Sequence, residues 1–337
     1  MNASKIFHVF LLSATHVAFG QADLREWTNV SGTNIKAKFI RADEDTVTLF
    51  MKGRNFDVKL SDLKPDSQDL ARKLSNPGPS IELKAAVKEK KSFPEIRVIK
   101  ADWGGASLRD IGKVLNSSAR QLWPYASQEE LNPIIVDRSR TGPIVLFRRG
   151  NEGQYIVRLD THKTFWSQYA FQFSHEFCHI MCGYKAGDQS NQWFEESLCE
   201  TASLFAMRRM RKEWEEKPPY PNWKSYAPAL EKYAQERLDS HVWPDSLTVA
   251  EWYDRNKEKL KENPIDREKN TTIATKLLPL FEQRPGNWGA VAFLNVHKTK
   301  DSRNFSTYLA DWRRACKFAR DKEFVSELAR MFGVEKS

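Results

Sequence analysis

Cysteine is scarce in this sequence, and long apolar runs are missing from nearly all of it. Only four of the 337 residues are cysteines, and the first of them is Cys178. A bacterial lipoprotein, which carries its lipid on an early cysteine, is thereby excluded. Outside the N-terminus no segment is apolar enough to cross a bilayer, so we expect no transmembrane segment. Internal repeats are absent as well.

The charge and composition favour a folded protein with a mixed-charge surface. The chain has 53 basic and 44 acidic residues, a net charge of +9 that is spread along the sequence. This mild excess predicts a solvated surface and no nucleic-acid partner, and it leaves open a surface for anionic cell walls or acidic polymers. Hydrophobic residues make up 40% and aromatic residues 12%, enough to form a packed core. The length allows one large domain with a small one.

The first twenty residues, "MNASKIFHVFLLSATHVAFG", have the order of a signal peptide. Lys5 precedes a short apolar run, and Ala18 and Gly20 occupy the two positions that a signal peptidase inspects. We therefore predict a cleavable signal peptide over residues 1–20, cut after Gly20, and a secreted or periplasmic protein. The alternative is an N-terminal helix of a cytosolic protein.

Residues 21–75 have the pattern of a small β-barrel. The segments "NIKAKFIRA", "DTVTLFMK" and "NFDVKLSDL" alternate apolar and polar residues, and turn residues separate them. A barrel of five short strands is typical of this pattern.

The same region carries a family resemblance. The motifs "REWT", "SG" and "AKF" and the closing "VKLSDLKPDSQDLA" resemble the SH3-like homology domain first described in a eukaryotic endocytic adaptor, which recurs in exported bacterial proteins. The resemblance implies a module that binds another protein or a cell surface and carries no catalytic residues.

A linker separates this module from the rest of the chain. Residues 76–93 contain Pro77, Gly78 and Pro79 and then a lysine-rich run, which predicts an extended connection. Residues 94–337 form the second domain. Its sequence predicts a strand in "EIRVIKADW", a helix capped by Ser107, three more strands in "NPIIVDRS", "GPIVLFRR" and "QYIVRLDT", and then helices to the end. The fold class is α+β, with an α-helical lobe after the sheet.

The stretch "FSHEFCHIMCG" holds two histidines one helical turn apart. His175 and His179 lie on one face of the predicted helix, and Glu176 lies about 100° round it. Two such histidines supply two nitrogen ligands for zinc, and the glutamate can accept a proton from an activated water. A helix whose histidines are merely buried in a core or lie on the surface is the alternative.

A second helix, containing "QWFEESLCE", supplies acids at the same spacing. Glu196 and Glu200 share one face among apolar neighbours, so the first is predicted to bind zinc and the second to orient a ligand histidine. An amphipathic helix that shows its acids to solvent is the alternative. Glu195 is a rival ligand, but it shares no face with Glu200.

Together, "HEFCH" and "WFEESLCE" resemble the gluzincin clan of zinc metallopeptidases. The resemblance implies a zincin-like catalytic domain of a mixed sheet and active-site helices. It implies that His175, His179 and Glu196 bind Zn2+, that Glu176 is the general base, and that Glu200 supports a ligand. It also implies that residues 154–160 form an edge strand that pairs with a peptide substrate. Glu195 and Cys199 depart from the residues common in this clan.

The resemblance further implies a tyrosine or histidine that stabilises the oxyanion. The sequence leaves five candidates open: Tyr226, Tyr233, His241, Tyr253 and His297. His162, by contrast, is predicted to be structural.

The cysteines admit three interpretations. Cys182 lies close to the histidine face and could serve as a ligand. In an exported protein, a disulfide from Cys178 or Cys182 to Cys199 could join the two helices. Buried free thiols that pack as small apolar side chains are the third interpretation.

The sequence therefore predicts an exported zinc peptidase in which Glu176 accepts the proton of a zinc-activated water. Two other functions stay open. One is a catalytically inactive zincin-like scaffold or binding protein, and the other is a zinc amidase that acts on cell-wall crosslinks.

Overall fold

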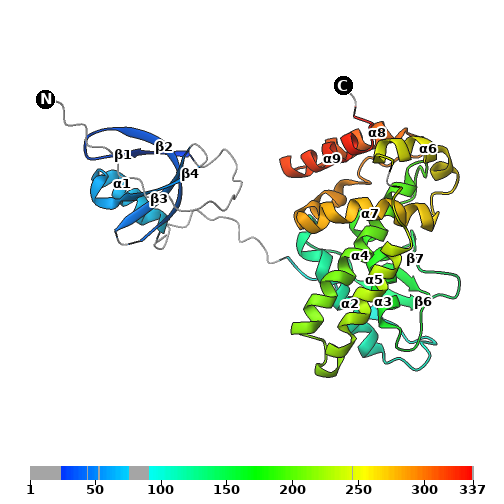
Figure 1. The fold of residues 1–337 in the computed structure, drawn as a ribbon. Coiled ribbons are helices and arrows are strands. Elements are labelled where there is room, and N and C mark those ends of the chain that lie inside the picture. Colours follow the sequence, from blue (N-terminus) through cyan, green and yellow to red (C-terminus); the bar gives the residue numbers. More distant parts are fainter. Residues whose placement is uncertain (1–23, 44, 52–53, 76–90, 245, 336–337) are drawn as a thin grey trace. The chain divides into compact units, whose positions relative to one another are not determined.

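The computed structural model describes residues 24–43, 45–51, 54–75, 91–244 and 246–335. The chain divides into two compact units, residues 1–88 and 89–337, which are described separately (Figure 1). The predicted signal peptide, residues 1–20, and residues 76–90 of the predicted linker lie outside the described residues. None of the helices in the described part of the chain combines the length and the apolarity that crossing a membrane requires.

The N-terminal unit is a four-stranded antiparallel sheet followed by a helix. Strands β1 to β4 are hydrogen-bonded in sequence order. The elements are β1 (Leu24–Thr28), β2 (Asn34–Ala42), β3 (Thr46–Met51), β4 (Arg54–Lys59), the 3-10 helix η2 (Leu60–Asp62) and α1 (Pro65–Ser75). The three segments with alternating apolar residues are β2, β3 and β4, as predicted.

Trp27 lies at the centre of this unit. Its side chain is fully buried, its Nε1 donates a hydrogen bond to the carbonyl of Ala37 at 3.1 Å, and its ring stacks on Phe39. After β4 and η2, Leu63 forms an isolated antiparallel bridge with Asn29, and the chain then enters α1. The described strands therefore form an open sheet and do not close into the predicted five-strand barrel. Pro65, whose fixed φ suits the first turn of a helix, ends the extended segment.

The second unit begins with a four-stranded mixed sheet in the order β5-β6-β8-β7. Its strands are β5 (Ile96–Val98), β6 (Ile134–Arg138), β7 (Ile144–Val145) and β8 (Tyr155–Leu159). β5, β6 and β8 are parallel, whereas β7 is antiparallel to β8. The four predicted strands are confirmed.

The predicted position of residues 154–160 at the sheet edge is wrong. β8, which these residues form, lies between β6 and β7. The chain turns back after β6 at Gly142, whose φ of 105° suits glycine. β7 then pairs with the outer side of β8, so the short strand Ile144–Val145 becomes the edge.

Helices make up the rest of the second unit, and the α+β class is confirmed. They are α2 (Leu108–Leu122), α3 (Trp166–Met181), α4 (Gln192–Glu216), α5 (Ala227–Asp239), α6 (Val249–Glu262), α7 (Arg267–Gln283), α8 (Phe305–Ala315) and α9 (Ala319–Met331), with 3-10 segments η3 (Trp123–Tyr125), η4 (Pro221–Tyr226) and η5 (Pro285–Phe293). Ser107 caps α2 as predicted, because its side chain accepts a hydrogen bond from the Asp110 amide.

Two helices, α3 and α4, form the centre of this unit. α3 packs against the sheet, α2 and α4, while α7 covers another side of α4. Phe173 and Phe177 of α3 are fully buried and stack on each other at a centroid distance of 5.9 Å. Ser203 of α4 donates a hydrogen bond to the Phe171 carbonyl at 2.8 Å, which ties the two helices together. Side chains between α3 and α4 are consequently held in a rigid, largely apolar environment.

Candidate metal centre

The two histidines of α3 point into the space between α3 and α4. Their ring centroids are 5.1 Å apart, as expected for neighbours one turn apart on a helix face. His179 is 4% exposed, whereas the side chain of His175 keeps 18% of its exposure. The pair therefore reaches the surface on the His175 side only.

Both histidines direct the same ring nitrogen at Glu196. Nε2 of His175 lies 3.1 Å from Oε2 of Glu196, and Nε2 of His179 lies 3.6 Å from Oε1. Gln192, one turn earlier on α4, donates a hydrogen bond to the same Oε1 at 3.1 Å. The predicted three ligands are thus brought together, with two nitrogens and one carboxylate around one point.

Glu200 lies at the other nitrogen of His175. The distance from Nδ1 to Oε2 of Glu200 is 3.7 Å. Oε1 of Glu200 accepts a hydrogen bond from the hydroxyl of Thr271 on α7 at 3.0 Å. Glu200 is 9% exposed, so its carboxylate is fixed between α3 and α7.

Glu195 occupies the corresponding position at His179. Nδ1 of His179 lies 2.8 Å from Oε1 of Glu195. Oε2 accepts a hydrogen bond from Asn295 at 2.9 Å and lies 3.7 Å from Nζ of Lys298. Glu195 therefore lies at Nδ1 of His179, whereas Glu196 faces Nε2 of both histidines. Glu195 shares no helix face with Glu200, but each of them meets one histidine of α3.

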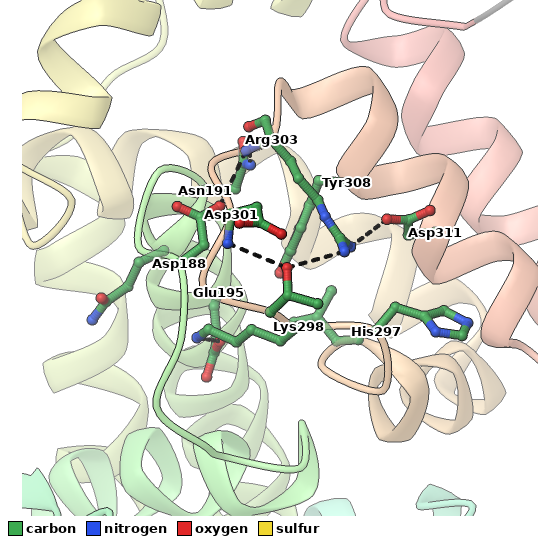
Figure 2. A pocket seen from close by; sticks show the side chains of 12 residues that line it. Asp188, Asn191, Glu195, His297, Lys298, Asp301, Arg303, Tyr308 and Asp311 are labelled. Carbon is green, nitrogen blue, oxygen red and sulfur yellow. Dashed lines mark hydrogen bonds and ion pairs between the residues drawn. The ribbon is translucent and has the colours of Figure 1, made fainter.

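Lys298 reaches Glu195 along a small pocket that Figure 2 shows from close by. Its side chain is only 8% exposed. Gly187 makes room for it, because a Cβ there would lie 2.9 Å from Cγ of Lys298 and 2.7 Å from the Thr299 carbonyl oxygen. Glycine is required at this position for space, since its φ is not in the left-handed region.

The protonation of the cluster reflects these contacts. Burial opposes the charged form of His175, but its contacts with the carboxylates of Glu196 and Glu200 outweigh burial and raise its pKa to about 9. Burial also disfavours ionised Glu196, yet the two imidazoles hold the pKa of this carboxyl well below its usual range. Opposite charges therefore face each other in this cluster, and a divalent cation that displaced the imidazole protons would meet the same carboxylates.

Glu176 is buried beside the histidines, with 4% of its surface exposed. Burial raises the pKa of its carboxyl, although the nearby imidazoles act in the opposite direction. The backbone of Val145 in β7 lies close enough to this carboxylate to lower its pKa. The edge strand of the sheet therefore passes directly beside this glutamate.

All four cysteines are free and buried, which agrees with the interpretation as packed thiols and not with a disulfide to Cys199. Cys182 is not the cysteine that approaches the histidines. Instead, the sulfur of Cys199 and one nitrogen of each histidine all lie within 4.8 Å of one another. Burial raises the pKa of the Cys199 thiol well above its usual range, which disfavours the thiolate that a metal requires.

The donor set fits zinc in either of two combinations. Zinc accepts imidazole nitrogen together with carboxylate oxygen or thiolate sulfur. Glu196 is the better third ligand, because its carboxylate contacts Nε2 of both His175 and His179 and already has a depressed pKa. Each Nδ1 then has an outer carboxylate of its own, as metal-binding histidines usually do.

Within the described residues, the five candidates for the oxyanion donor contact residues other than His175, His179 and Glu196. Tyr226 accepts a hydrogen bond from the Ser167 amide, and Tyr233 accepts one from Arg237. Nδ1 of His241 lies 2.7 Å from the Arg237 carbonyl oxygen. Tyr253 stacks on Trp193, and His297 lines the pocket of Lys298. His162, predicted to be structural, packs its ring against Phe165.

Tyr184, which the sequence did not single out, lies beside the cluster. Its ring centroid is 5.2 Å from that of His179 and 4.3 Å from that of Phe147, on which it stacks. Burial raises the pKa of its hydroxyl, and the charges of Glu195, Glu176 and Glu196 raise it further. Tyr184 sits in the loop after α3, so no helical spacing could have connected it to the histidines.

Comparisons with protein-family models, with curated proteins and with solved structures gave no match for this chain. The proposed function therefore depends on the geometry of this cluster.

Proposed function

We propose that the protein is a zinc-dependent peptidase of gluzincin type, with His175, His179 and Glu196 as the zinc ligands. One observation carries the proposal. Nε2 of both histidines faces a single carboxylate, while Nδ1 of each has a separate outer carboxylate, Glu200 or Glu195. A pair of histidines buried only for packing has no need of three acids arranged in this way.

Glu176 is the general base of the proposed reaction. Zinc held by His175, His179 and Glu196 would act there as a Lewis acid, which would activate a water molecule and polarise the scissile carbonyl. The carboxylate of Glu176 accepts a proton from the attacking water and then delivers it to the leaving amide nitrogen. Burial raises the pKa of Glu176, which brings it closer to the operating pH and suits it to both transfers.

Tyr184 is the proposed donor to the oxyanion. Its hydroxyl remains protonated, since burial and three neighbouring carboxylates raise its pKa. A neutral phenol can donate a hydrogen bond to the oxygen on which negative charge develops. The stacking of Phe147 on its ring limits the motion of the side chain.

The edge strand β7 is the proposed site of backbone pairing with substrate. An extended peptide can add to an exposed sheet edge. Val145 places this edge next to Glu176, and the neighbouring side chains of Ile144 and Phe147 are 45% and 46% exposed. Apolar side chains exposed beside a candidate site favour contact with a substrate.

The N-terminal unit is proposed to be an SH3-like binding module, and residues 1–20 a signal peptide for export. The antiparallel sheet around Trp27 supports the first assignment. Zincin-like architecture in the second unit is supported by the mixed sheet, whose antiparallel edge strand β7 adjoins α3, the helix that carries both histidines.

Metal analysis and a peptide library test the proposal together. We expect about one zinc per chain and cleavage that is lost in Glu176→Gln but retained in Glu216→Gln, a change on an exposed side chain of α4. Zinc without cleavage would support the inactive scaffold. Cleavage of a cell-wall crosslink in place of peptides would support the amidase. A protein that binds no zinc would overturn the site.

A further inference from the structure

A groove separate from the pocket of Lys298 lies along β5, at the edge of the mixed sheet opposite to β7. It is lined by β5, by one face of α2 and by the end of α4, and its volume is about 410 Å³. We call it the β5 groove. The residues used below are Ile96 and Val98 of β5, Arg109, Lys113 and Arg120 of α2, and Lys217 after α4. Its size is that of a ligand site, and it is separate from the proposed zinc ligands.

The walls of the β5 groove are strongly cationic. Arg109, Lys113 and Arg120 are four and seven residues apart, so they share one face of α2. Lys217, the residue that follows α4, lines the same groove. Within the described residues none of the four forms an ion pair. The one carboxylate in the lining belongs to Glu213, whose Oε2 accepts hydrogen bonds from Ser117 at 2.8 Å and Gln121 at 2.6 Å.

Gly112 lines the groove. It lies inside α2, where glycine is less favourable than alanine. A Cβ at this position would meet no atom within 4 Å, so the packing of the fold does not require glycine here. The absent side chain leaves open space at this point of the lining.

Within the described residues, the backbone of β5 offers hydrogen-bonding groups that no other strand uses. There β5 ends the sheet and its one partner strand is β6, in parallel. The carbonyl of Glu95 accepts a bond from the Ile134 amide and the amide of Ile99 donates one to the Val136 carbonyl, so both residues face β6. Because successive residues of a strand face opposite sides, the amides and carbonyls of Ile96 and Val98 face away from β6. An edge of this kind accepts an additional strand.

We propose that the β5 groove binds an extended acidic peptide segment of a protein partner. The segment pairs its backbone with Ile96 and Val98 and places its carboxylates against Arg109, Lys113 and Arg120. The free strand edge favours a peptide over an acidic polysaccharide, which has no amide ladder to offer. The proposal is independent of the zinc site and of the proposed peptidase activity.

Fluorescence anisotropy with the whole protein tests the proposal. The probe is a labelled seven-residue peptide of alternating glutamate and valine, and we expect Arg109→Glu/Lys113→Glu to weaken its binding by about tenfold or more. Arg255→Glu/Lys259→Glu is the matched control, because these two exposed residues have the same spacing on α6 and the same change in charge. Equal weakening by both pairs would show general attraction to a protein of charge +9 and overturn the proposal.

Two further variants separate the peptide from other anions. Val98→Pro removes an amide that faces away from β6, so it should weaken the probe while leaving the sheet intact, as circular dichroism would verify. Gly112→Leu should weaken it by filling the groove. Unchanged binding to a folded Val98→Pro variant, or tighter binding of polyglucuronate than of the peptide, would contradict strand addition. Binding that persists in Glu176→Gln would show that the groove acts apart from the zinc site.

Discussion

Nδ1 of His179 and Oε1 of Glu195 lie 2.8 Å apart, the shortest contact between a carboxylate and either histidine of the metal centre. When Nδ1 carries the proton and donates it to Glu195, the lone pair of Nε2 is left for a metal. The same carboxylate is held by Asn295 and Lys298. Glu195 thus fixes both the tautomer and the orientation of a proposed ligand.

Glu195→Ala is accordingly expected to raise the zinc dissociation constant by about 10- to 100-fold, because the ring of His179 loses its orienting partner. Competition with a chromogenic chelator measures this constant directly. Glu216→Ala, on an exposed residue of the same helix, serves as the control and should leave it unchanged. Equal affinity in the two variants would show that Glu195 contributes nothing to the metal site.

The identity of the third ligand can be decided by two substitutions on α4. Glu196→Ala should weaken zinc binding by about 100-fold or more, since it removes an oxygen ligand, whereas Cys199→Ala should change it by about threefold or less. Both dissociation constants are measured under reducing conditions. The opposite order would assign the third position to Cys199, whose sulfur lies within 4.8 Å of both histidines.

Tyr184→Phe removes only the hydroxyl that is proposed to stabilise the oxyanion. We expect kcat on a peptide substrate to fall by about 10²- to 10³-fold, with little change in KM or in zinc content. Tyr226→Phe is the comparison, because its hydroxyl is occupied by Ser167. If kcat fell equally in both variants, or only KM changed, Tyr184 would not be the donor.

Two glycines should respond to alanine in opposite directions. In Gly187→Ala the new Cβ meets the Thr299 carbonyl oxygen and Lys298, so we expect a loss of about 1–3 kcal/mol in unfolding free energy. In Gly112→Ala the Cβ meets nothing and helix propensity improves, so we expect a gain of about 0.5–1 kcal/mol. Thermal or urea unfolding monitored by circular dichroism compares them. A gain of stability in Gly187→Ala would contradict the close packing of Lys298.

The number of free cysteine thiols can be counted directly. Unreduced protein in denaturant should give four reactive thiols with Ellman's reagent, because none of the four cysteines is in a disulfide. The folded protein should react slowly, since all four are buried. A count of two in denaturant would show that one disulfide forms.

The features that could be predicted from the sequence are those that depend on neighbours along the chain. His175 and His179 share a face of α3, as their spacing requires, and Glu196 and Glu200 share one of α4. The capping of α2 by Ser107 likewise involves residues three positions apart. Local periodicity determines which face a side chain occupies.

Contacts that depend on tertiary packing could not be predicted from the sequence. Glu195 is held by Asn295, a hundred residues later, and Tyr184 meets Phe147 across a loop. The order of the strands was also missed at β7, because a two-residue strand carries almost no periodic signal. In each case two segments meet in the fold, but the hydrophobic pattern of one segment carries no information about the other.

The partners of the two outer carboxylates come from late in the chain. Thr271 holds Glu200, and Asn295 and Lys298 hold Glu195. During synthesis or passage across a membrane, α3 and α4 therefore emerge well before the residues that orient their metal-facing side chains. The proposed zinc site can therefore be complete only after Thr271, Asn295 and Lys298 have been made and have packed against α4.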